Sequence, residues 1–128
     1  MSTINEKQAA EQLLYCYAAV LNKANLASIS SFYAFDGLFM PDGFKTLTKK
    51  DLDAAGGKFL QNKTFKIKYD IQSVTVGNEF AFIDATARTT TVPNGGDEIL
   101  HTSRDFFVLR KDGTDWKIYR YLFNKVQD

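Results

Sequence analysis

The hydrophobic pattern of the chain changes its period once, near Thr64, and this change constrains the fold more than any other feature. Before it, apolar residues recur at helical spacing, as at Leu13, Tyr17 and Leu21. After it, apolar and polar residues alternate in long runs that are separated by turn-forming residues. Helices followed by strands predict an α+β domain in which the helices cover one face of a curved sheet.

The alternating part of the chain predicts four strands joined by tight turns. The strands are expected at residues 64–76, 79–92, 98–111 and 116–124, with turns at 77–78, 93–97 and 112–115. Sequential strands joined by such short turns are expected to pair in an antiparallel manner.

The earlier part of the chain predicts helices. Thr3 with Glu6 forms a capping-box pattern at the start of the first one, and Thr48 with Asp51 marks the start of a later one. The expected helical segments after the first are a short one at 26–33 and a longer one at 49–62.

Length and composition narrow the class of protein. The 128 residues are the length of a single domain, and the 11 Phe and 6 Tyr are enough large rings to fill or line a cavity. The net charge of +1 and the scattered Lys and Arg argue against nucleic acid as a partner. We find no signal-peptide pattern and no apolar run of the ~20 residues that a membrane span needs. Because the single cysteine, Cys16, has no partner for an internal disulfide, we expect a cytoplasmic protein.

Three segments of the chain carry a resemblance to a known family. They are YAAVLN at 17–22, SFYAFDGLFM at 31–40 and DFFVLRKDGTDWKIYRYLFN at 105–124. In this order, with the alternating strands, they resemble the NTF2-like superfamily, specifically its SnoaL-like and ketosteroid-isomerase-like branch. The resemblance covers nearly the whole chain. It implies a cone in which three N-terminal helices pack on a curved, mostly antiparallel sheet and enclose a pocket for a small, largely apolar carbonyl-type molecule.

The resemblance implies that Tyr17 and Asp105 form an oxyanion hole, because they fall where the isomerases carry a tyrosine and a second acid. In ketosteroid isomerase, a tyrosine works beside a carboxylic acid that its apolar site keeps neutral. Tyr17 is equally consistent with a tyrosine that packs in the core from the apolar face of its helix. For Asp105, the alternative is an ion pair with a nearby arginine. The candidate arginines are Arg88, Arg104 and Arg120.

The position of the general base departs from the family pattern. The isomerases carry a proton-abstracting aspartate at the end of the strand that here reads GLFM, where this chain has Pro41. Asp42 follows one residue later, within a Pro-Asp-Gly turn. An offset of one residue directs a strand side chain to the other face, although a turn relaxes this rule. We therefore do not expect steroid isomerisation with the usual base, and we expect Asp42 to serve chiefly as a turn residue.

Alternation along the strands predicts which other side chains line the pocket. On the strand at 79–92, Asp84, Thr86 and Arg88 share one face, and the family resemblance implies that this face looks into the cavity and makes it polar. With the opposite parity, all three face solvent or a partner subunit. His101 is the only histidine, so no His-based metal site is expected, and it should lie at the cavity mouth or on the surface. No phosphate-binding or dinucleotide-binding motif is present, and we expect no cofactor. The expected lining residues are Phe39, Asp84, Thr86, Arg88, His101, Ser103 and Phe107.

The closing strand indicates a covered outer face of the sheet. Strict alternation puts Tyr119, Tyr121 and Phe123 on one face, and large apolar residues such as Trp116 and Ile118 on the other. A sheet face in contact with solvent is usually polar, so a second copy of the chain is expected to cover the outer one. The family resemblance also implies a homodimer through this surface.

Two functions remain open at this stage. One is an enzyme of the isomerase, cyclase or dehydratase type that stabilises an enolate with Tyr17 and Asp105 and uses Asp42, Asp84 or a water as the base. The other is a non-catalytic ligand-binding or association module with the same cone. A fold of this kind serves both uses, so the fold does not decide between them.

Overall fold

The computed structural model describes residues 5–23, 26–59, 65–92 and 95–127. The elements are α1 (Glu6–Asn22), α2 (Leu26–Ile29), the 3₁₀ turn η1 (Ser30–Phe32), β1 (Tyr33–Met40), β2 (Leu47–Thr48), α3 (Lys49–Phe59), β3 (Lys66–Val76), β4 (Phe80–Thr91), β5 (Ile99–Asp112) and β6 (Asp115–Val126). The four strands predicted from alternation are thus confirmed, with shifts of a few residues at their ends. No helix within the described residues is long and apolar enough to cross a membrane.

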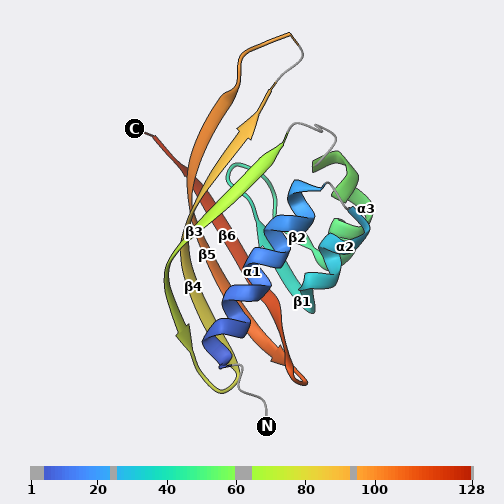
Figure 1. The fold of residues 1–128 in the computed structure, drawn as a ribbon. Helices are drawn as coiled ribbons and strands as arrows, with labels where there is room; N and C mark the ends of the chain where they lie inside the picture. The colour runs from blue at the N-terminus through green and yellow to red at the C-terminus, as the bar shows by residue number, and fades with distance from the viewer. Residues whose placement is uncertain (1–4, 24–25, 60–64, 93–94, 128) are drawn as a thin grey trace.

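The six strands of the described chain form one open, mixed sheet in the order β2-β1-β6-β5-β4-β3. The hairpins β3–β4, β4–β5 and β5–β6 are antiparallel, as is the short pair β1–β2, whereas β1 and β6 run parallel. Figure 1 shows that the sheet is strongly curved, that the helices lie on one side of it, and that the β4–β5 hairpin projects beyond the other strands. The inner face of the curved sheet and the helices enclose the core.

The prediction of three N-terminal helices was wrong. The described part of the chain has two helices of more than one turn, α1 and α3, and α3 follows β1 and β2. The second predicted helix is reduced to the single turn of α2 and the 3₁₀ turn η1. A serine hydroxyl competes with helical bonding there, because Ser31 Oγ donates to the Ser28 carbonyl at 2.6 Å. The buried, β-favouring Tyr33 then begins the strand.

Side chains cap both longer helices. Asn5 is the N-cap of α1, and its Oδ1 accepts a hydrogen bond from the Gln8 N–H at 2.8 Å. The predicted cap Thr3 lies outside the described residues. At α3 the predicted capping box is confirmed, since Thr48 and Asp51 each accept the other's backbone N–H through their side chains, at 3.1 and 3.0 Å.

A β-bulge in β6 corrects the predicted parity of the closing strand. Leu109 pairs with Ile118 but the preceding Val108 pairs with Arg120, so Tyr119 is an extra residue in β6. The bulge turns both Ile118 and Tyr121 toward the core, where each is buried. The prediction that Tyr119 and Tyr121 share a face was therefore wrong.

The parity predicted for β4 was also wrong. Its inward face consists of small or branched apolar residues, all of them buried: Ala81, Ile83, Ala85 and Ala87. Asp84, Thr86 and Arg88 therefore lie on the outer face. Small side chains here leave room for the aromatic rings of the neighbouring strands, which explains why the set with the smaller residues, rather than the one with Phe80 and Phe82, forms the core side.

Gly37 allows β1 to approach β6 closely. A Cβ at this position would lie 2.5 Å from the Ile118 carbonyl oxygen and 3.0 Å from that of Ala34. Both are backbone atoms, which cannot rotate away as a side chain would. We predict that Gly37→Ala lowers the free energy of unfolding by about 1–3 kcal/mol, the usual cost of overpacking.

Urea denaturation of purified variants would measure this cost. Gly77→Ala is the matched control, because a Cβ there meets only the Phe80 carbonyl oxygen, at 3.2 Å. Equal stability losses in the two variants would contradict the close-approach explanation.

Candidate functional site

A cavity of about 330 Å³ lies between the helices and the inner face of the sheet. Most of its wall is apolar, and a few polar groups converge on it, as is typical of small-molecule sites. Its lining residues are Tyr17, Leu21, Ile29, Phe39, Pro41, Asp42, Phe44, Leu52, Phe65, Ile67, Tyr69, Thr89, Thr91, His101, Ser103, Asp105, Tyr121, Phe123 and Lys125.

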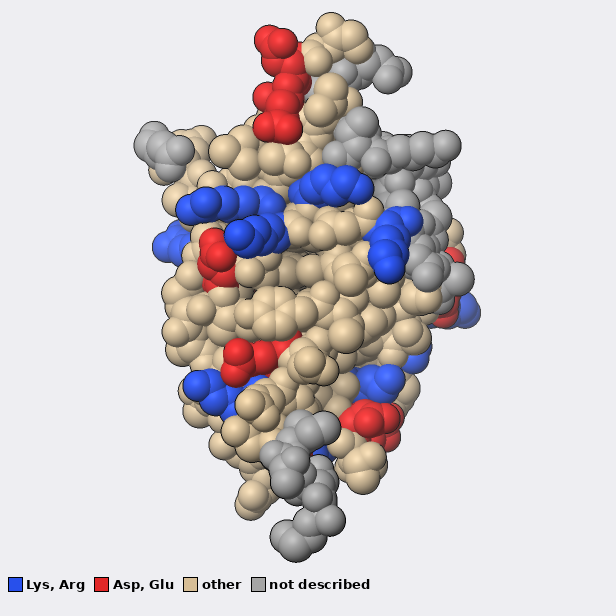
Figure 2. Space-filling model, in the orientation of Figure 1, with Lys and Arg blue, Asp and Glu red and all other residues tan. Residues whose placement is uncertain are grey.

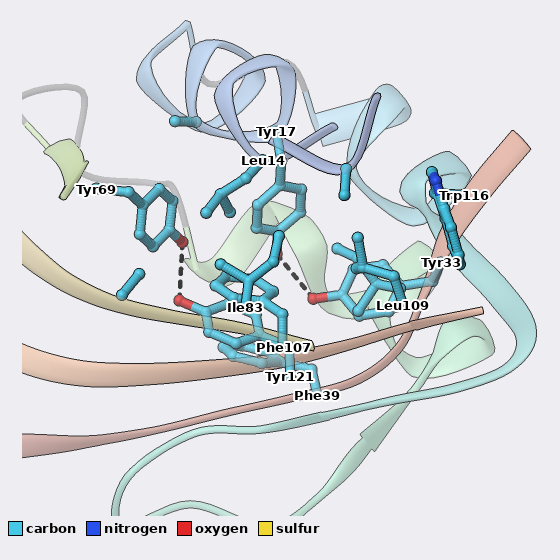
Figure 3. Close-up of a cluster of buried hydrophobic side chains, with 14 of the residues drawn as sticks. Leu14, Tyr17, Tyr33, Phe39, Tyr69, Ile83, Phe107, Leu109, Trp116 and Tyr121 are labelled. Carbon is cyan, nitrogen blue, oxygen red and sulfur yellow. Dashed lines mark hydrogen bonds between the residues drawn. The ribbon is translucent and has the colours of Figure 1, made fainter. Parts of the chain in front are cut away.

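A tyrosine pair fixes the direction of one hydroxyl proton in this cavity. The hydroxyls of Tyr17 and Tyr33 lie 2.8 Å apart, and both side chains are buried (Figure 3). Tyr33 has no other partner among the described residues, and a buried hydroxyl rarely leaves its proton unused. Tyr33 therefore donates to Tyr17, which leaves the Tyr17 proton free to point into the cavity that it lines. Burial raises the pKa of Tyr17, so this hydroxyl stays protonated.

A second chain of hydrogen bonds ends at Asp105. Tyr121 donates to Asp105 Oδ2 and Ser103 donates to Oδ1, both at 2.5 Å. The Tyr69 hydroxyl lies 2.8 Å from that of Tyr121 (Figure 3). Since the Tyr121 proton is used on Asp105, Tyr69 donates to Tyr121. All the donations in this chain thus run toward Asp105.

The Asp105 carboxyl is 3% exposed. Burial raises its pKa above 3.8, and the hydrogen bonds from Ser103 and Tyr121 oppose that rise in part. The alternative of an ion pair was wrong within the described residues. Arg88 and Arg104 are exposed on the outer face, and Arg120 donates to the backbone carbonyls of Asp36 and Tyr119.

Asp42 lies at the cavity, although it was predicted to be chiefly a turn residue. The turn after β1 brings both Pro41 and Asp42 into the wall, which relaxes the one-residue offset. One carboxylate oxygen of Asp42 accepts the Lys125 backbone N–H at 3.0 Å. A carboxylate has further acceptor positions, so Asp42 can still accept a proton from a ligand.

The other predicted lining residues divide into two groups. Phe39, His101 and Ser103 line the cavity, and His101 is exposed at its mouth as expected. Phe107 is fully buried behind Tyr121, with ring centroids 4.0 Å apart, and does not line the cavity.

Three residues predicted for the cavity lie on the outer face instead. Asp84 accepts a hydrogen bond from Ser73 Oγ at 2.7 Å, and Thr86 Oγ1 donates to Gln72 Oε1 at 3.2 Å. Asp84 and Thr86 line a shallow depression there. Arg88 is exposed on the same face. The cavity is therefore more apolar than the sequence predicted.

Several residues of the site were missed by the sequence reasoning. Tyr69, Tyr121, Thr89 and Lys125 line the cavity, and Tyr33 is bonded to Tyr17 behind its wall. For Tyr121, the bulge at Tyr119 concealed the inward orientation.

The fold agrees with that of several solved structures, all of which share one architecture. The chain has an NTF2-like, cystatin-like fold. A ketosteroid isomerase-like protein from Erwinia carotovora atroseptica SCRI1043 superposes with a TM-score of 0.82 at 23% identity, over 98% of this chain and 100% of that one. An NTF2-like protein with a cystatin-like fold from Novosphingobium aromaticivorans gives 0.77 at 14% identity, over 95% and 82% of the two chains.

A third solved structure has the same fold. A Xanthomonas campestris protein assigned as a calcium/calmodulin-dependent protein kinase II association domain gives a TM-score of 0.80 at 19% identity, over 100% of this chain and 93% of that one. The sequence matches no protein-family model and no curated protein. At these identities the likeness establishes the fold, and function has to be argued from the site.

The raised pKa of Asp105 predicts a pH-dependent stability. Folded protein with a raised carboxyl pKa holds its proton more tightly than the unfolded chain, so stability falls as pH rises from about 4 through the folded-state pKa. Asp105→Asn removes this loss. We predict that the variant gains stability relative to wild type over that range, at no more than about 1.4 kcal/mol per pH unit.

Thermal or urea unfolding at a series of pH values measures this difference. Asp51→Asn is a control with the opposite sign, because the Thr48 backbone hydrogen bond lowers the pKa of Asp51. The stability of wild type relative to Asp51→Asn should therefore increase as pH rises through the acidic range. A gap between wild type and Asp105→Asn that does not change with pH would contradict the burial argument.

Proposed function

We propose that this protein binds a small, largely apolar carbonyl compound in its cavity and catalyses an isomerase- or cyclase-type proton transfer on it. Tyr17 and the protonated Asp105 hydrogen-bond to the carbonyl oxygen, and Asp42 is the candidate base. The observation that carries the proposal is that the Tyr17 hydroxyl, bonded among the described residues only to the Tyr33 hydroxyl, lines the same apolar cavity as the buried Asp105 carboxyl.

The inner end of the cavity suits an oxygen that gains negative charge. Two donors held in a dry, low-dielectric site stabilise an enolate far more than water-exposed donors do. Tyr33 supports Tyr17 by donating to it, and this polarises the Tyr17 O–H bond. Protonated Asp105 keeps acceptor capacity for Tyr121 or Ser103 while its own proton is donated to the ligand.

Proton transfer needs a base on the opposite side of the ligand. Asp42 at the mouth is an ionisable carboxyl with a free acceptor position, and it lines the cavity with Tyr17 and Asp105. In the proposed reaction, Asp42 takes a proton from the carbon next to the carbonyl, and the electron pair of that C–H bond forms the enolate. Asp42 then returns the proton at another carbon, which leaves the protein unchanged.

Binding of a phenol that mimics an enolate tests the proposed oxyanion hole at the inner end of the cavity. We predict that naphthol binds wild type, and that Tyr17→Phe and Asp105→Asn each weaken this binding about tenfold or more, the value of a hydrogen bond to a charged group. Tyr15→Phe is the matched control, because Tyr15 is exposed on the same helix and does not line the cavity. Isothermal titration would give the dissociation constants. Equal affinities in all four proteins would remove the oxyanion role.

The outer sheet face favours a second candidate function, that of a dimeric binding or association module. Phe82 is 43% exposed and stacks on Phe106, with ring centroids 6.2 Å apart, and Leu122 beside them is also exposed. Exposed apolar groups grouped on a sheet face are typical of protein contacts. The similarity to the Xanthomonas association domain supports this candidate as well. The occupant we propose is a second copy of the chain in a two-fold contact.

Oligomeric state tests the second candidate. We predict that Phe82→Glu converts a dimer to a monomer in sedimentation experiments, because the contact would bury two unpaired carboxylates near its axis. Tyr15→Glu, at a similarly exposed aromatic on α1, should leave the dimer intact. A wild-type monomer, or equal effects of the two substitutions, would contradict a dimer through this face.

A further inference from the structure

The cavity mouth carries donor side chains that the proposed chemistry does not use. We define the rim as Thr89, Thr91, His101 and Lys125, all of which line the cavity. Thr89 and His101 pair directly across β4 and β5, and Lys125 belongs to the neighbouring β6. The rim is thus built by three adjacent strands, on the same face of the sheet as the core.

The rim residues lie at two distances from the inner end of the cavity. His101 precedes Asp105 by four residues on β5, which corresponds to about 13 Å of extended chain. Lys125 pairs with Ser103, two residues before Asp105, and so lies about half as far along the strands. Apolar side chains wall the space between the rim and the inner end, among them Ile67 and Phe123. A ligand that fills the cavity therefore meets polar groups at its two ends and apolar groups along its body.

The charged and titratable side chains at the mouth are distributed unevenly across the strands of the sheet. Among the described lining residues they are Lys125, His101 and Asp42. Asp42 follows β1, so it lies on the β1 side of Lys125, where it accepts that residue's backbone N–H. On the β5 and β4 side stand only His101 and the two threonines of the rim, which offer an imidazole and two hydroxyls.

Cationic side chains also lie on the molecular surface at this end of the sheet. Figure 2 shows a band of Lys and Arg side chains below the tip of the β4–β5 hairpin, while acidic side chains gather at the tip itself. Of the described Lys and Arg residues, Lys125 lines the cavity.

We propose that the ligand is an amphipathic acid. Its apolar ring system fills the cavity, its carbonyl or enol oxygen lies at Tyr17 and Asp105, and a carboxylate at its far end is held by the β4–β5 side of the rim and by Lys125. This inference rests on the proposed function, because it uses the same cavity and the same inner end. The apolar body supplies most of the affinity, and the rim selects acids over neutral compounds of the same shape.

Two probes of matched shape test the inference. Hydroxynaphthoate and the corresponding hydroxynaphthamide, each with its two substituents at opposite ends of the ring system, differ in the charge of one end. We expect wild type to bind the acid about three- to fivefold more tightly than the amide at low salt, the range for a solvent-exposed ion pair. Lys125→Gln should erase this preference. Lys68→Gln, which removes an exposed lysine on the opposite face of β3, should retain it.

The outcomes separate this inference from the proposed function. If both probes bind with equal affinity and Tyr17→Phe weakens the binding of both, the inner end of the cavity binds a ligand oxygen as proposed. The inference that the ligand carries a carboxylate at its far end is then wrong. If neither probe binds, the proposed function and this inference both fail. If the preference for the acid persists in Lys125→Gln and in a Lys125→Gln/His101→Gln double variant, the rim is not the source of the selectivity and the inference is overturned.

Discussion

The arrangement of the cavity depends on the inward orientation of Tyr121. Its ring stacks on Phe107 and on Phe39, with centroids 4.0 and 5.1 Å away, and so joins the core of the sheet to the wall of the cavity. Its hydroxyl is bonded to both Tyr69 and Asp105. One side chain therefore supplies apolar packing and the orientation of the buried carboxyl. It faces inward only because the bulge at Tyr119 adds a residue before it.

Buried hydroxyls are costly unless each proton is used, and this requirement organises the polar part of the site. In the chain from Tyr69 through Tyr121 to Asp105, both tyrosine hydroxyl protons are used within the protein. The pair of Tyr33 and Tyr17 uses one hydroxyl proton and directs the other to the cavity. Among the tyrosine hydroxyls of these two sets, Tyr17 is thus the donor without a partner in the described residues, and a ligand oxygen is the natural acceptor for it.

The sequence predicted the order and type of most elements because period and turn chemistry are local properties. The capping box of Thr48 and Asp51 and the alternation from residue 64 onward required no knowledge of distant contacts. The parity of β4 could not be predicted in the same way, because Ala85 and Ala87 are buried by the bulk of rings on other strands. The bulge likewise depends on pairing between β5 and β6, and it reversed the faces assigned to Tyr119 and Tyr121. On β5, Ser103 and Asp105 follow unbroken alternation and lie in the cavity wall, whereas Phe107 on the same face is buried behind Tyr121.

The parallel pairing of β1 with β6 has a consequence for how the chain folds. Tyr33 pairs with Ile118, so the centre of the sheet joins segments that are far apart in the sequence. The three hairpins can form by local contacts, and β1 can pair early with the short β2, but β1 gains its long partner only when β6 has been synthesised. Closing such a long loop is entropically costly, and topologies rich in distant contacts fold slowly. During synthesis, the edge of β1 that later faces β6 stays open for most of the chain, so the nascent protein is exposed to misassembly until its last strand emerges.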